Sequence, residues 1–229
     1  MTVVINYLSN NYSIVATDTR LTFNTNEYRD DIIKLRSLPI PLGFVAGVGF
    51  STFLERYKDF MAFPISGAID IKARLLEAAR QIIIETPEHK FGVENSEVYV
   101  SWITNDGKNN YCKIGVMATQ PAQKEDEIFY IKENTMHIAY PSKFPKEKIA
   151  EIEEKHLILN GNYLDLWAAI NLVITIFRDI SFESDGVSYL CHIGIQVLDG
   201  ANIRKYIAIE NVIRLIENPQ KHFLELKLT

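Results

Sequence analysis

The stretch TVVINYLSNNYSIVATDTR, residues 2–20, decides how the chain begins to fold. Its two apolar runs, TVVINYL and YSIVATDTR, are rich in β-branched residues, which favour strands. The residues between them, SNN, are typical of a tight turn. The stretch therefore predicts a β-hairpin. A short turn brings the end of the second strand back beside the start of the first, so we expect Asp18 to lie near Thr2.

Outward from this hairpin, strand and helix patterns follow one another in blocks. Strand-like runs at residues 31–38 and 41–49 precede helical patterns at 50–61 and 68–86. Four more strand-like runs predict two hairpins, one across Asp106-Gly107 and one between residues 127–133 and 136–142. The remaining patterns are helices at 146–155 and 163–180 and strands at 187–198, 202–211 and 222–228.

Segregated blocks of strands and helices indicate an α+β protein rather than alternating βαβ units. The apolar helices need cover, and two sheets packed together with helices outside each sheet would provide it. No internal repeat, low-complexity tract or linker rich in Pro, Gly or Ser interrupts the pattern. We therefore expect residues 1–229 to form a single domain.

Composition narrows the functional classes. A net charge of -5 argues against a general affinity for nucleic acid or for an anionic membrane. The longest apolar run, residues 166–177, is far shorter than the roughly 20 residues that span a bilayer, and the first residues lack the pattern of a signal peptide. Cys112 and Cys191 sit in strand-like runs, which favours buried thiols in the cytoplasm. The histidines and cysteines show no metal-ligand spacing, and His192 is expected to be a hydrogen-bonded core residue.

The position of Thr2 raises a catalytic hypothesis. If Met1 is removed, Thr2 carries both a nucleophilic hydroxyl and a free α-amine that can act as its base. Such a nucleophile needs a lysine to lower the relevant pKa values, a carboxylate to orient that lysine and a backbone donor for the oxyanion. Asp18 and Lys34 follow at two equal intervals of 16 residues. Gly47, just before a helical pattern, can present its N–H without side-chain hindrance.

The order TVVINYL, VATDTRLT, IIKL and FVAGVG resembles the N-terminal third of proteasome β-subunits and of HslV-type subunits, which are N-terminal-nucleophile (Ntn) threonine peptidases. The resemblance implies a four-layer αββα sandwich of two antiparallel sheets. It also implies that Thr2 is the nucleophile, that Lys34 and Asp18 activate it and that Gly47 holds the oxyanion. In the late acidic loop it assigns Asp179, with Ser184 or Ser181, to the support of the Thr2 amine; Ser184 is preferred.

The sequence also departs from that family. Residues 136–142 hold no Ser-Gly-Ser turn of the kind that the family places against its threonine, and Ser142 is a poor substitute. Gly47 is equally explained by tight packing between a strand and a helix, and Arg20 by a structural salt bridge.

The resemblance implies hydrolysis of peptide bonds in peptides or unfolded proteins, without a metal or organic cofactor. It further implies a homo-oligomeric ring and a ring ATPase as partner, with no nucleic acid and no membrane. Two other functions stay open: an Ntn amidase that acts on small amides, and a catalytically silent proteasome-like scaffold subunit.

Overall fold

A computed structural model describes residues 2–24, 27–65, 68–119, 128–156 and 163–223. Ten of its strands form two five-stranded sheets in which every pairing is antiparallel. Sheet I has the order β10 (Thr135–Ala139), β1 (Val4–Leu8), β2 (Tyr12–Asp18), β11 (Leu190–Asp199) and β12 (Asn202–Asn211). Sheet II has the order β5 (Arg36–Ser37), β6 (Leu42–Val48), β7 (Glu97–Asn105), β8 (Asn110–Ala118) and β9 (Phe129–Tyr130). A separate hairpin pairs β3 (Leu21–Asn24) with β4 (Glu27–Arg29).

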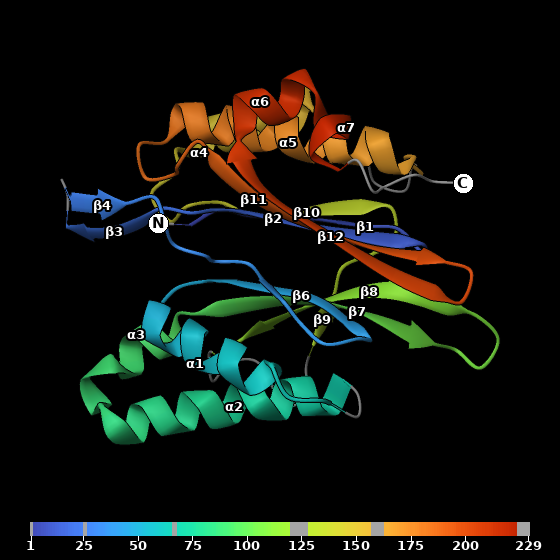
Figure 1. Ribbon diagram of the computed structural model, residues 1–229. Helices are drawn as coiled ribbons and strands as arrows, with labels where there is room; N and C mark the ends of the chain where they lie inside the picture. Colours follow the sequence, from blue (N-terminus) through green and yellow to red (C-terminus); the bar gives the residue numbers. More distant parts are fainter. Residues whose placement is uncertain (1, 25–26, 66–67, 120–127, 157–162, 224–229) are drawn as a thin grey trace.

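Helices cover the outer face of each sheet (Figure 1). Sheet II carries α1 (Ser51–Met61), α2 (Ala68–Glu85), the 3-10 helix η1 (Pro87–His89) and α3 (Lys90–Glu94). Sheet I carries α4 (Lys146–Lys155), α5 (Leu166–Glu183), α6 (Val212–Glu217) and α7 (Pro219–His222). The expectation of an α+β chain with antiparallel sheets is thereby confirmed. None of the described helices is long and apolar enough to cross a membrane.

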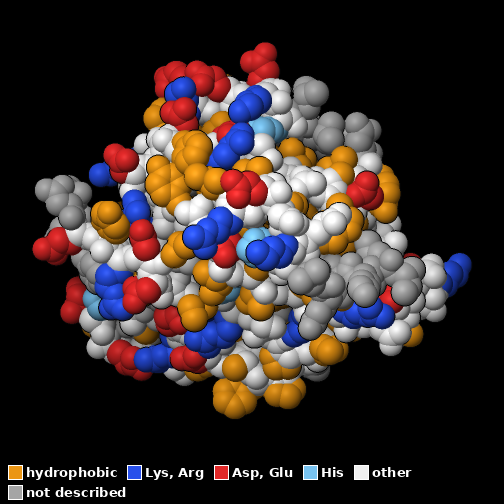
Figure 2. Space-filling model, turned by 45° about the horizontal axis from the view of Figure 1, so that its top comes forward, with side chains coloured by type: hydrophobic (Ala, Val, Ile, Leu, Met, Phe, Trp, Pro, Cys, Tyr) orange, Lys and Arg blue, Asp and Glu red, His pale blue; other side chains and the backbone are white. Residues whose placement is uncertain are grey.

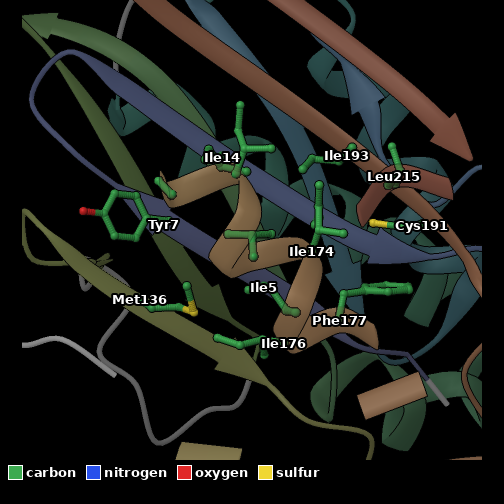
Figure 3. Close-up of a cluster of buried hydrophobic side chains, with 14 of the residues drawn as sticks. Ile5, Tyr7, Ile14, Met136, Ile174, Ile176, Phe177, Cys191, Ile193 and Leu215 are labelled. Carbon is green, nitrogen blue, oxygen red and sulfur yellow. The ribbon is translucent and has the colours of Figure 1, made fainter. Parts of the chain in front are cut away.

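Each strand of the first hairpin is buried along its whole length because it has an apolar neighbour on both faces. In β2, Ile14 and Ala16 belong to the cluster beneath α5, whereas Val15 belongs to the cluster between the two sheets. Figure 3 shows side chains of α5 facing those of β1, β2 and β11 in the first of these clusters. Asp165 is the N-cap residue of α5, and its carboxylate accepts the Ala168 N–H at 2.8 Å.

The layer between the sheets is close-packed but contains polar side chains. An added Cβ at Gly194 of β11 would lie 2.7 Å from the Phe44 ring of β6, so the two sheets meet there through a glycine. His192 is buried on the same face, and neither ring nitrogen has a hydrogen-bond partner among the described residues. The expectation of a hydrogen-bonded histidine is therefore not met by the protein groups around it.

The structure departs from the predicted elements in several places. Residues 31–38 contribute only the two-residue strand β5, and the residues before them form the β3–β4 hairpin, which the sequence patterns do not predict. The runs at 127–133 and 136–142 do not pair with each other: β9 joins sheet II and β10 joins sheet I. Asn134, with φ 55° and its N–H bonded to Leu8 O, turns the chain from one sheet to the other. The predicted last strand begins within α7 and otherwise lies outside the described residues, apart from Phe223.

Candidate active site

Thr2, Asp18 and Lys34 meet at one end of the space between the sheets, and we call these three residues the Thr2 cluster. The Lys34 Nζ donates to Thr2 Oγ1 at 2.9 Å and to both oxygens of Asp18, at 3.0 and 2.9 Å. The Asp18 side chain is 0% exposed and that of Lys34 is 10% exposed. The ammonium group therefore bridges the hydroxyl to a carboxylate that water does not reach.

The hairpin itself positions Asp18, as the sequence predicts. The antiparallel register pairs Val4 with Thr17, so its continuation sets Val3 opposite Asp18. The Val3 N–H donates to Asp18 Oδ1 at 3.2 Å, and the Arg20 N–H donates to Oδ2 at 2.9 Å. Two backbone donors thus fix the carboxylate in addition to Lys34.

Burial and charge act against each other in this pair. Burial raises the pKa of Asp18, while the Lys34 ammonium and the N–H groups of Arg20 and Val3 oppose that rise. Burial lowers the pKa of Lys34, and the Asp18 carboxylate opposes that change. An ammonium ion in this position costs free energy unless a carboxylate faces it, which explains the close pairing.

The segment that carries Lys34 is held against the end of β2. The Arg20 guanidinium binds Asp30 through two hydrogen bonds, of 2.6 and 2.7 Å, and lies 3.9 Å from the centre of the Tyr28 ring. The Ile32 N–H donates to Thr19 O at 3.2 Å. These contacts, rather than a long strand, deliver Lys34 to Thr2. The interpretation of Arg20 as a structural salt bridge agrees with them.

Gly47 lies in β6, close to this segment. Arg36 pairs with Val45, and the same register continued by two residues sets Lys34 opposite Gly47. An added Cβ at Gly47 would lie 2.5 Å from Leu54 Cδ2 and 2.9 Å from Glu97 O. Packing alone therefore requires a glycine here. The role of its N–H in holding an oxyanion stays a prediction.

The structure does not bring Asp179 into the Thr2 cluster. Its carboxylate lies on α5 and bonds Lys155 and His156, each at 2.7 Å, and Arg178 at 2.8 Å. Ser184 is the C-cap residue of α5, and its carbonyl accepts the Val187 N–H at 3.1 Å. The alternative, Ser181, donates to Arg178 O at 2.8 Å within α5. None of these contacts involves Thr2, so the assignment of these residues to the Thr2 amine stays a prediction.

The late acidic loop does approach the end of β2, but through Asp185 and the following Ser188, two residues that sequence reasoning did not select. Ser188 Oγ lies 3.1 Å from the Thr19 N, which donates to it, and 3.0 Å from Thr19 Oγ1. Arg20 Nη1 donates to the backbone carbonyl of Asp185. The cause is the pairing of β2 with β11, which sets Cys191 opposite Asp18. No local signal links two strands so far apart in the sequence.

Metal ligands are not grouped in the part of the chain that the structure describes: it contains no cluster of three or more His, Cys, Asp or Glu side chains able to hold an ion. Cys112 and Cys191 are buried free thiols, as the sequence predicts.

Comparison with known proteins rests on structure alone. No family model matches the sequence, and no curated protein matches it. Anbu (ancestral beta-subunit) from Yersinia bercovieri aligns with a TM-score of 0.69 at 13% identity, over 100% of this chain and 98% of that chain. The fold of this chain is similar to that of Anbu.

A second Anbu structure, from Hyphomicrobium sp. strain MC1, gives a TM-score of 0.64 at 11% identity, over 97% of this chain and 95% of that chain. The Anbu (Gly-1) mutant from the same strain gives 0.63 at 12% identity, with 98% and 95% covered.

These structures correct the resemblance that the N-terminal motifs suggest. The motifs point to proteasome β-subunits and HslV-type subunits, whereas the similar solved structures reported above are Anbu proteins. The motif order in the first third of the chain is therefore not enough to separate those families. TM-scores of 0.63 to 0.69 show a similar fold, but at identities of 11 to 13% the chemistry of this chain must be argued from its own residues.

Proposed function

We propose that this chain is a threonine-type hydrolase that cleaves peptide bonds with Thr2 as an N-terminal nucleophile, exposed when Met1 is removed. The observation that carries the proposal is the single ammonium group of Lys34, 2.9 Å from both Thr2 Oγ1 and Asp18 Oδ2. Met1 lies outside the described residues. The proposal includes one domain over residues 1–229 with the four-layer arrangement of an Ntn hydrolase.

In the proposed reaction the Thr2 hydroxyl oxygen forms a bond to the substrate carbonyl carbon, and its proton passes to the Thr2 α-amine. That proton then goes to the leaving amine as the C–N bond breaks. Water hydrolyses the resulting ester and restores the hydroxyl. An unperturbed α-amine has a pKa of about 7.7–8.0, so a useful fraction is free to accept a proton near pH 7.

The other proposed site residues stabilise the negative charge that develops during the reaction. The Lys34 ammonium stabilises the oxygen of Thr2 as it loses its proton, and Asp18 fixes that ammonium in place. The Gly47 N–H is the proposed donor to the oxyanion. Loss of one such donor typically lowers kcat by about 100-fold to 1000-fold. Asp179 and Ser184 are left out of the proposal, because their contacts lie within and around α5.

Assembly belongs to the same proposal. The name of Anbu, ancestral beta-subunit, denotes a component of an assembly, which supports a homo-oligomeric ring that encloses the sites. A ring ATPase could feed such a chamber with unfolded protein. Two buried free thiols fit a reducing compartment such as the cytoplasm.

The test is the intact mass of the protein before and after exposure to a peptide epoxyketone, which requires both a free threonine amine and its hydroxyl. We expect loss of one methionine and addition of one probe per chain. Thr2→Val, which keeps the β-branched shape, should take up none, and Thr2→Ser should retain labelling. Lys34→Ala should slow labelling at least about 100-fold, in the usual range for a proton-transfer group. Lys155→Ala, a lysine beside Asp179, is the matched control and should label normally.

Each outcome separates the rival functions. A chain that keeps Met1 and takes up no probe is a silent scaffold. A chain that labels at Thr2 but hydrolyses only small amides, and no peptide in a mixed library, is an amidase. Normal labelling of Lys34→Ala would overturn the assigned role of Lys34.

A further inference from the structure

The strand β12 forms one outer edge of sheet I and runs for ten residues, Asn202–Asn211 (Figure 1). Among the described residues its sheet partner is β11, paired in one unbroken register from Leu190–Asn211 to Asp199–Asn202. The helix α6 begins directly after it. A long, regular edge strand offers a row of hydrogen-bonding groups to another strand.

The hydrogen-bond pattern shows which residues of β12 face that edge. The Leu198 N–H donates across to Asn11 O beside β2, so the alternate residues of β11 are directed to β12. The Val212 N–H donates to Tyr189 O, which agrees with this alternation. Five residues of β12 therefore direct their backbone N–H and C=O groups to the outside: Ile203, Lys205, Ile207, Ile209 and Asn211, whose N–H donates to Glu210 Oε1.

The side chains at this edge do not block a partner. Ile207 and Ile209 are each 49% exposed. Both lie on the face of sheet I that is turned toward sheet II, but sheet II does not cover this part of it. An inward lysine is a common device against edge pairing. Lys205 does point toward sheet II, but its Nζ already donates there to Ser37 Oγ at 3.1 Å and to Leu38 O, so the ammonium keeps these partners and does not extend across the edge.

The charges on β12 are complementary under one particular two-fold axis. If two β12 strands pair antiparallel about Ile207, each Arg204 stands opposite Glu210 of the other strand. These two positions form non-hydrogen-bonded pairs, in which side chains approach most closely. An axis one residue earlier would set Arg204 opposite Ala208, and an axis at Lys205 would set two lysines against each other. Only the Ile207 axis both matches the outward backbone groups and pairs the charges.

We propose that two copies of this chain associate through β12, antiparallel about a two-fold axis at Ile207, so that their two sheets I form one continuous sheet. The contact is isologous, with the same patch on both copies. Arg204 now lies 3.1 Å from Asp199, and Glu210 lies 3.7 Å from Arg214. Such exposed pairs contribute little, so both side chains can exchange partners on association. The inference does not rest on the proposed peptidase activity.

Charge reversal tests the register by sedimentation velocity over a range of protein concentrations. Arg204→Glu and Glu210→Arg should each weaken the pairing at least about tenfold in Kd, because like charges then face each other twice. The double variant should restore it. Arg80→Glu, which reverses the charge of an exposed arginine on α2 away from β12, is the matched control and should leave the Kd unchanged. Wild-type protein that stays monomeric at every concentration, or a double variant that does not recover, overturns the proposal.

A cross-link tests the axis directly. Ile207→Cys should form a disulfide between two copies under mild oxidation, since the facing Cα atoms of such a pair lie about 5.5 Å apart. Ile203→Cys should not, because it would face Asn211 of the partner. The native thiols are buried and give little background. Cross-linking of both variants alike would contradict this axis. Because mass is the readout, failure here leaves the Thr2 proposal untouched.

Discussion

Two aspartates of this chain, Asp18 and Asp179, each bind cations, yet their surroundings differ in kind. Asp18 is 0% exposed, and its ionic partner Lys34 comes from a different segment of the chain. The Asp179 side chain is 12% exposed and sits among Lys155, His156 and Arg178, near the outer surface of the helix layer. On the face seen in Figure 2, acidic and basic side chains are interspersed in the same way.

The difference teaches which acidic residue can do chemistry. The Asp179 carboxylate is shared among several cations, and two of them, Lys155 and Arg178, are 57% and 31% exposed, so part of this cluster stays in water and costs less to build. A buried pair must overcome the desolvation of both charges, and it holds its geometry because neither side chain can move into water. The buried pair of Asp18 and Lys34 is also the one that contacts a hydroxyl group, that of Thr2. Burial of charge should set the size of the effect at three positions: largest at Asp18, intermediate at the buried His192 and smallest at Asp179.

The largest effect is expected at the buried pair. Asp18→Ala removes the carboxylate that faces the Lys34 ammonium and should lower the free energy of unfolding by about 3–5 kcal/mol, measured by urea denaturation. The double change Asp18→Ala with Lys34→Met should recover part of the loss, because neither charge then remains buried. A loss below about 1 kcal/mol for Asp18→Ala would show that the pair is not desolvated as described.

The second effect concerns acid stability. Burial, followed by the Lys58 ammonium, lowers the pKa of His192 to about 4. An unfolded chain protonates this histidine near pH 6.5, but the folded chain does not, so stability falls as the pH drops from 6.5 to 4. The loss from this residue amounts to about 3 kcal/mol. His192→Gln should remove that part of the pH dependence in urea titrations at pH 7 and pH 4. Equal slopes for both proteins would contradict it.

The smallest effect is expected at the surface cluster. Asp179→Asn should change the free energy of unfolding at pH 7 by less than about 1 kcal/mol and leave epoxyketone labelling intact. Burial alone would raise the pKa of Asp179, but hydrogen bonds from Lys155, His156 and Arg178 lower it. The contribution of the carboxylate is therefore present at neutral pH and is lost as the pH falls below its ordinary pKa. A loss of labelling in this variant would place Asp179 in the active site after all.

The fold could be predicted where its signals are local. The first hairpin, the hairpin across Asp106-Gly107 and the helices α1, α2, α4 and α5 follow from period, turn residues and capping. The pairing of residues 127–133 with 136–142 failed, because both strands have sheet neighbours that lie elsewhere in the chain. The hairpin β3–β4 was missed because its polar sequence has the composition of a loop.

The candidate site divides in the same way. Asp18 could be placed beside Thr2 from the hairpin alone, since a short turn fixes the register. Lys34 was correctly predicted to lie near Thr2, but it was expected on a strand that the structure does not contain. Contacts of Arg20 with Asp30 and of Ile32 with Thr19 hold the Lys34 segment in place instead. Asp179 and Ser184 were chosen from a linear motif, and their contacts in the structure are with Lys155, His156, Arg178 and Val187 rather than with Thr2.

By itself, the sequence determined the hairpin, the α+β character and the facing of Asp18 to Thr2, because these depend on interactions between residues that a single turn brings together. Tertiary structure alone decided that Lys34 completes the cluster, that Ser188 reaches the end of β2, and that β12 is left at an edge. The physical reason is that strand order in a sheet is set by the burial of whole faces. Many distant residues share that burial, and no short stretch of sequence encodes it.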